Sequence, residues 1–492
     1  MPRLNRIHRL TLIALALASL ATPAARAEPV AADAAPDVPE AALADEAAAA
    51  DLPDDAPAAD ADLDAAADAD LDAASDADLD ALLDVGTPAA GSEAATGIKW
   101  GGYAELGMAY TYRDPERWSH LRARGELTGS GQVAPRVRWK LNARAELDGA
   151  FDLEDEHYPA AVRRDQRRDL MLREAYVDVG HGDWEFRFGR QHVVWGEMVG
   201  FFFADVVSAR DMRDFLQTEL ERMRIGQWAV RAEHFGADTH FELLWVPKPS
   251  FDQIGKPGSD FYTYPWMPAD TVVSEDRPGG DIDDGNWGAR ISHLVDGWDL
   301  SAFYYHSYDV APTLHAYAPG RAELRHERID QVGGTFSKDL GSFVLKGEAV
   351  HTSGRSVNTF ALAGNPPVVG LVGTDLVDYA FGVDLPSGDW RFNVQYYGRR
   401  LDDHRPAMMM DRHEQGVSLQ IVHGTGTDLE AEVLAVTSLN RSDYSLRPKL
   451  SWKFAPAWRA TVGVDVFGGK DRGMFGVYDD RDRAWLELRR WF

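Results

Sequence analysis

From residue 98 onward, hydrophobic and polar positions alternate along the chain with a period of two. In the stretch 136–148, charged or amide side chains occupy the even positions and apolar side chains the odd ones. Successive side chains of a strand point to opposite faces, so this stretch predicts a two-sided sheet element. At about 13 residues it is longer than the roughly five or six residues of a typical soluble strand.

The alternation recurs to the end of the chain and predicts an all-β fold, a transmembrane antiparallel up-and-down β-barrel. The expected strands lie near 98–112, 118–129, 134–149, 169–180, 183–192, 224–235, 239–247, 286–295, 298–309, 323–338, 341–353, 376–385, 389–401, 413–423, 427–438, 443–455, 457–468 and 482–492. These are about 18 strands, with 16 as the alternative count, and their connections are short at one end and mostly long at the other. A soluble β-sandwich is the competing architecture, but its strands would be shorter and their outer faces polar.

One stretch interrupts the alternation after residue 192. Apolar residues at spacings of three and four predict a short helix over 208–223. A helix or loop at this position would most simply fold into the lumen as a constriction, and an outer loop capped by a helix is the alternative. The constriction candidates are Arg190, Gln191, Trp195, Glu197, Asp205, Arg210, Asp211 and Arg213.

The first 97 residues have a different composition. Residues 1–27 begin with three arginines, which a short apolar run and a small-x-small site follow; this order predicts a cleaved secretory signal peptide and thus a bacterial outer-membrane destination. Residues 28–97 hold 20 acidic side chains and no Lys or Arg, which predicts a disordered, self-repelling periplasmic linker. The barrel is expected over residues 98–492.

Composition excludes several classes of protein. The chain has no cysteine, so disulfides, thiolate metal sites and thiol catalysis are excluded. The formal net charge of −28 argues against a nucleic acid partner, which requires many Lys and Arg contacts to phosphate. The histidines show no metal-ligand spacing and no phosphate-binding glycine loop follows a strand, so neither a metal nor another cofactor is expected.

Charged side chains on the inward parity of the strands predict two luminal walls. The basic wall comprises Arg122, Arg124, Arg136, Arg138, Lys140, Arg144, Arg447, Lys449, Arg483 and Arg489. The acidic wall comprises Asp378, Asp384, Asp428, Glu430 and Glu432. Facing walls of opposite sign would set up a transverse field that favours polar or anionic solutes. Alternatively, the charges pair with one another and close the lumen.

Several stretches carry a family resemblance. The runs 189–197, 204–215 and 224–228, followed by 346–349, 382–384 and 393–396, resemble a proteobacterial outer-membrane barrel family of unknown function that is distantly similar to alginate-export barrels. The resemblance implies an outer-membrane transport or accessory barrel.

The functional expectation is a porin-like outer-membrane channel for small polar or anionic solutes and no enzymatic activity. An export or scaffold barrel that works with a periplasmic partner is the alternative. A third, phospholipase-like alternative depends on His351, Ser353 and Asn358, which resemble a His-x-Ser plus Asn arrangement. The expected partners are outer-membrane lipid, lipopolysaccharide and the barrel-assembly machinery.

Overall fold

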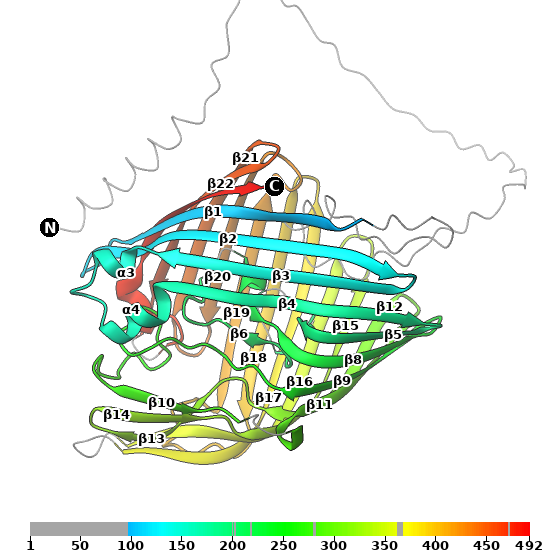
Figure 1. The fold of residues 1–492 in the computed structure, drawn as a ribbon. Coiled ribbons are helices and arrows are strands. Elements are labelled where there is room, and N and C mark those ends of the chain that lie inside the picture. The colour runs from blue at the N-terminus through cyan, green and yellow to red at the C-terminus, as the bar shows by residue number, and fades with distance from the viewer. Residues whose placement is uncertain are drawn as a thin grey trace, which may run out of the picture. The chain divides into compact units, whose positions relative to one another are not determined.

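Eighteen antiparallel strands close into a barrel (Figure 1). The computed structural model describes residues 97–198, 200, 203–216, 219–278, 282–361, 368–470 and 473–492. Each wall strand pairs with the next along the chain, and the last strand pairs with the first, from Tyr103↔Trp491 to Thr111↔Arg483. The predicted fold class and strand count are confirmed. The predicted signal peptide lies outside the described residues, as does the predicted linker apart from Gly97.

The wall strands, in chain order, are β1 (Lys99–Thr111), β2 (Arg117–Ala134), β3 (Val137–Asp148), β4 (Arg168–His181), β5 (Trp184–Gln191), β8 (Gln227–Phe235), β9 (Thr239–Lys248), β11 (Asn286–Val295), β12 (Trp298–Tyr308), β15 (Arg328–Asp339), β16 (Val344–Ala361), β17 (Val368–Ser387), β18 (Trp390–Leu401), β19 (His413–His423), β20 (Leu429–Ser438), β21 (Tyr444–Ala455), β22 (Trp458–Gly468) and β23 (Arg483–Trp491).

Short hairpin turns join the strands at the end of the barrel where both β1 begins and β23 ends. Asp296 and Gly297 form one of them, with φ of 52° and 72°. Two consecutive positive φ angles are the geometry of a type I′ turn, which matches the twist of the flanking strands. The long connections lie at the opposite end, so the predicted division into short turns and long loops is confirmed.

Alternating side chains face opposite sides of the wall. On β1, Glu105 is 3% exposed and the adjacent Leu106 is 61% exposed. On β18, Asn393 is buried while Val394 next to it is exposed. Exposed aliphatic side chains and buried polar ones on the same strand are the pattern of a barrel whose outer face meets lipid.

Aromatic side chains gather on the outer face near both ends of the barrel. Near the short turns, Trp184 stacks on Phe186 and Trp390 stacks on Phe392. Near the long loops, exposed Trp245 lies directly opposite Trp287 in the β9–β11 register. Such girdles mark the two membrane–water interfaces of outer-membrane barrels.

The long loops carry their own secondary structure. A three-stranded sheet is made of β10 (Val272–Asp276), β13 (Thr313–Ala318) and β14 (Arg321–Arg325). Short helices are α3 (Ala150–Leu153), α4 (Ala160–Gln166), η2 (Ile282–Asp284) and η3 (Gly476–Arg481). Among the described residues, no helix is long and apolar enough to cross a membrane.

Because the outer face of the wall contacts lipid, a charge placed there should destabilise the protein more than the same charge placed in a loop. Leu106→Arg places a guanidinium on the outer face in the middle of β1, which should lower the free energy of unfolding in bilayers by about 2–4 kcal/mol. Val272→Arg is the matched control, because Val272 is equally exposed but belongs to the loop sheet. Urea titration in lipid vesicles, followed by tryptophan fluorescence, measures both. Equal effects of the two substitutions would contradict the assignment.

Candidate functional site

The chain leaves the barrel wall after β5 and returns to it at β8; we call residues 192–226 between these strands the inward segment. Its two ends are held together by Gln191 and Gln227, which are directly paired and fully buried. The Gln227 amide nitrogen donates to the Val207 carbonyl at 2.9 Å. Within the segment, β6 (Ala209–Arg210) pairs with β7 (Arg224–Ile225). These contacts form a narrow neck from which the rest of the segment enters the lumen.

The predicted helix over 208–223 is wrong. The described part of this stretch contains β6, a turn at 213–216 and one turn of 3₁₀ helix, η1 (Leu220–Met223). The Asp214 carboxylate accepts the backbone N–H of Leu216, and aspartates that bond to the backbone two residues on favour turns. The Met212 N–H donates to the Gln253 carbonyl of another loop instead of to a helical partner.

The first part of the inward segment is fixed to β9 and β16. The indole N–H of buried Trp195 donates to the Glu242 carboxylate on β9 at 3.0 Å. The Glu348 carboxylate on β16 accepts the backbone N–H of Glu197 at 3.0 Å and that of Ala204 at 3.3 Å. One buried carboxylate therefore holds the segment at two points, Glu197 and Ala204, which we call its tip.

The later part of the segment is fixed to β1, β2 and β23, nearly opposite β16 in the strand order. The Asp214 carboxylate accepts a hydrogen bond from each terminal nitrogen of Arg483 at 3.2 Å, and it lies 2.8 Å from His120 Nε2. Arg222 lies 3.1 Å from Glu105, and Glu219 lies 2.8 Å from Arg489. The inward segment thus crosses the lumen and is held by charge at this side.

The predicted basic residues face the lumen with one exception, and each of these luminal side chains has a carboxylate nearby. The pairs are Arg122–Glu146 (2.9 Å), Arg124–Glu146 (2.8 Å), Arg138–Glu185 (2.8 Å), Lys140–Glu174 (2.9 Å), Arg144–Asp211 (3.9 Å), Arg447–Asp465 (3.0 Å), Lys449–Glu432 (2.8 Å), Arg483–Asp465 (2.8 Å) and Arg489–Glu105 (3.0 Å). The exception, Arg136, is exposed in the β2–β3 turn with a φ of 63°, so the alternation of β3 begins one residue later.

The predicted acidic residues do not form a continuous acidic wall. Asp378 accepts two hydrogen bonds from Arg399, and Asp384 lies 3.5 Å from Lys346. Glu430 and Glu432 are half-buried on β20, whereas Asp428 is exposed in the turn before that strand. Opposite charges therefore pair within each wall. The sequence interpretation omitted five of these partners from its walls, although each has the inward parity of its strand: Glu105, Glu146, Glu174, Glu185 and Asp465.

The predicted constriction residues divide into two groups. Trp195, Glu197, Asp205, Arg210, Asp211 and Arg213 all belong to the inward segment, and Gln191 lies at its neck. Arg190 does not: it has the parity of exposed Phe188 and pairs with exposed Trp228, so it projects from the outer face. Its Nε donates to the Leu172 carbonyl on β4 at 2.5 Å.

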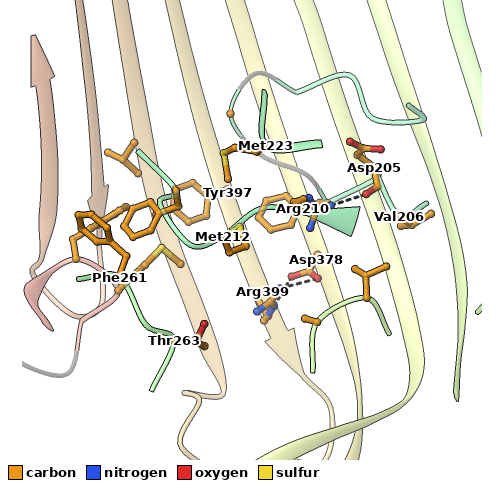
Figure 2. Close-up of a pocket in the computed structure, with 18 of the residues that line it drawn as sticks. Asp205, Val206, Arg210, Met212, Met223, Phe261, Thr263, Asp378, Tyr397 and Arg399 are labelled. Atoms are coloured by element: carbon orange, nitrogen blue, oxygen red, sulfur yellow. Dashed lines mark hydrogen bonds and ion pairs between the residues drawn. The ribbon is translucent and has the colours of Figure 1, made fainter. Parts of the chain in front are cut away.

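A cavity of about 530 Å³ lies between the inward segment and the wall strands β15 to β21. Figure 2 shows Met212, Met223 and Phe261 among its lining residues, together with the Arg399–Asp378 pair. In the same view, Arg210 bonds to Asp205, its neighbour in the segment, through the Asp205 carbonyl at 2.7 Å. Apolar and aromatic side chains form most of the lining, and a few charged or amide groups from β15 to β18 complete it.

The His-x-Ser plus Asn arrangement is divided by a bulge in β16. Register to the neighbouring strand β17 shifts between Thr352 and Arg355, and His351 is exposed on the outer face. Asn358 is buried, and its amide donates to the Leu314 carbonyl at 2.6 Å. In the part of the chain that the structure describes, no group of three or more His, Asp or Glu side chains could hold a metal ion.

A buried acidic side chain joins the inward segment to the loops above it. Asp252, in the β9–β11 loop, accepts the backbone N–H of Arg210 at 2.7 Å. Burial raises the pKa of Asp252 to about 6, although the Arg210 guanidinium and N–H oppose the shift. Asp309 raises this pKa further and His326 lowers it.

The closed barrel, its girdles and its luminal segment together define a porin-like outer-membrane β-barrel. Among solved structures, OccAB1 of Acinetobacter baumannii matches with a TM-score of 0.51 and 10% identity over 82% of this chain and 99% of that chain. OccD3 (OpdP) of Pseudomonas aeruginosa matches with a TM-score of 0.47 and 10% identity over 82% and 92%. The chain belongs to the family described as protein of unknown function (DUF1302), whose model matches residues 120–492. No curated protein matches the sequence.

The raised pKa of Asp252 predicts a pH dependence of stability. Its folded pKa of about 6 exceeds the unfolded value near 3.9, so the folded state binds the proton more tightly and is destabilised as the pH rises from about 4 to 6. Asp252→Asn removes a penalty on the order of 3 kcal/mol at pH 8 while keeping an oxygen acceptor for Arg210. Urea titrations of the wild type and Asp252→Asn should show a higher free energy of unfolding for the variant at pH 8, and no such difference at pH 4. An equal gain at both values would rule out this origin.

Proposed function

We propose that the protein is a substrate-selective outer-membrane channel for small solutes that combine an apolar body with a polar or anionic group. The observation that carries this proposal is the luminal cavity, whose volume lies within the roughly 300–1,000 Å³ of small-molecule sites. A cavity of this kind in the lumen selects solutes by contact as well as by size.

The apolar side of the cavity supports the choice of solute. Phe215 of the inward segment packs against Phe261 with ring centroids 5.1 Å apart, and against Tyr478 at 5.5 Å. Leu434 and Val436 of β20 line the cavity as well. Ordinary ions gain nothing from such a surface, whereas a solute with an aliphatic or aromatic body is desolvated favourably there.

The polar side supplies orientation. Arg399 forms two hydrogen bonds with Asp378, and Arg355 lies 2.9 Å from Asp309. Gln331 and Ser418 add neutral donors and acceptors to the same side. Few polar groups beside a mostly apolar lining are typical of sites that fix the orientation of a ligand. Because the arginines are paired with carboxylates, their positive charge is largely neutralised. The site is therefore suited to one polar or anionic group of a bound solute more than to the rapid conduction of anions.

We also propose that the inward segment is the gate of this channel. Glu348 holds its tip through two backbone N–H groups, while its other side is held by several buried ion pairs. Residues 1–27 and 28–97 act in this proposal as a cleaved leader and a periplasmic spacer.

Release of the tip should open the channel. Glu348→Ala removes the common acceptor of Glu197 and Ala204, and we expect single-channel conductance in planar bilayers to rise about twofold or more. A variant lacking residues 205–221 should conduct still better, because the segment can no longer cross the lumen. Glu323→Gln is the matched control, since Glu323 is paired with Arg325 in the loop sheet. Conductance unchanged in both test variants would contradict a gating role.

Selectivity gives a separate test. In proteoliposome swelling assays, we expect benzoate to enter faster relative to acetate than its size alone predicts, because its ring contacts the apolar side of the cavity. Val436→Asp places a charge on that side and should reduce the benzoate advantage severalfold while acetate entry changes less. Entry rates that follow solute size alone in the wild-type channel would refute the selectivity part of the proposal.

A further inference from the structure

Strand β4 has no neighbouring wall strand on one side over its outer half. It pairs with β3 from Arg168 to Val179, but with β5 only from Ala175 to His181. Strand β5 ends at Gln191, where the chain turns into the lumen. The edge of β4 over 168–174 is therefore open toward the β5 side. Open strand edges are costly in lipid, because backbone N–H and C=O groups find no water there.

Side chains and the inward segment close this edge instead of a strand. Ile225 packs with Met171 of β4 and with Ala209 in one buried cluster. Gly226 lies against the Arg173 carbonyl so closely that a Cβ atom would not fit. The Arg190 guanidinium bonds to the Leu172 carbonyl. We call this boundary between β4 and the segment the seam.

A crevice of about 350 Å³ lies along the seam. Its walls include Leu170 and Leu172 of β4 and Trp228 of β8, with Ile225 and Gln253 beside them. Leu170 is 80% exposed and Trp228 is 41% exposed on the lipid-facing surface. Asp169, which is paired with Arg213 at 2.7 Å, and Gln253 add polar groups to the lining. The crevice thus lies at the loop end of the barrel, with apolar side chains on its lipid-facing side.

Arg190 supplies positive charge to this recess. Its partners are the Leu172 carbonyl and, at 3.5 Å, the Ser250 hydroxyl. Among the described residues, no carboxylate oxygen lies within 4.0 Å of its guanidinium, in contrast to the luminal arginines described above. A guanidinium that is planar and rich in donors is suited to bind a phosphate group.

We propose that the crevice is a binding site for lipopolysaccharide, with one phosphate of its lipid A headgroup on Arg190 and an acyl chain against Leu170, Leu172 and Trp228. The site lies in the leaflet that contains this lipid, and its charge and apolar walls match the two parts of the molecule. The bound lipid covers the open edge of β4 from outside, where no strand covers it. The inference does not depend on the proposed channel function.

Lipid binding to the purified, folded protein tests the site. Native mass spectrometry with added bisphosphoryl lipid A should show one retained lipid on the wild type. Arg190→Gln keeps a donor for the Leu172 carbonyl but loses the charge, and should weaken binding about tenfold, whereas Arg190→Lys should weaken it less. Arg490→Gln is the matched control, because Arg490 is an exposed arginine of β23 near the short turns. Heat-modifiable migration on gels verifies that each variant is folded.

Three results would overturn the proposal. Unchanged lipid A binding by folded Arg190→Gln would show that Arg190 does not bind the phosphate. Equal losses in Arg190→Gln and Arg490→Gln would show general attraction to surface charge. Equally tight binding of phosphatidylglycerol would reassign the crevice to phospholipids in general. Conductance is recorded separately, so a failed channel hypothesis leaves this test intact.

Discussion

The need to hydrogen-bond the backbone groups of the wall is the constraint from which the rest of this molecule follows. Lipid offers no partner for an unpaired N–H or C=O, so the sheet must close on itself. Closure is completed by β1 and β23, and Phe492 exchanges backbone hydrogen bonds with Gly102 beyond the last paired residue of β23. Once the ring is closed, the period of two directs every second side chain into the lumen.

Closure therefore brings many charges into a confined space, and their pairing determines what else can lie there. Glu105 is almost fully buried and lies within 3.2 Å of Arg124, Arg222 and Arg489. Two of these arginines belong to the wall and Arg222 belongs to the inward segment. A buried charge without a partner is strongly destabilising, so the segment and the wall stabilise each other. The inward segment is in this sense part of the charge balance of the barrel.

Most of the wall can be read from the sequence, because strand parity is a local property. The expected strands at 286–295 and 413–423 coincide with β11 and β19, and the luminal parity of Arg124 and Arg483 follows from their neighbours. The partners of these residues are not local. Asp214 meets Arg483 from a position 269 residues away, and no spacing along the chain indicates such a contact.

The inward segment shows most clearly where the spacing of apolar residues fails to predict secondary structure. Met212 and Leu216 have helical spacing, yet they pack into different clusters, Met212 beside Tyr262 and Leu216 beside Phe261. A loop that contacts several walls also places apolar residues every three or four positions, so the pattern does not distinguish it from a helix. Arg190 stands directly before the interruption that predicts the constriction, yet strand parity with Phe188 places it on the outer face.

The two attachments of the inward segment differ in kind, and this difference defines how it can move. Moving Asp214 away from Arg483 and His120 would separate buried groups of opposite charge, which costs several kcal/mol. Freeing the tip from Glu348 breaks two hydrogen bonds from neutral N–H groups, and Glu197 and Ala204 can then bond to water. Motion should therefore begin at the tip while the side next to β1 and β23 stays in place. Because the tip borders the cavity near Phe203, such a motion widens the apolar side of the cavity first.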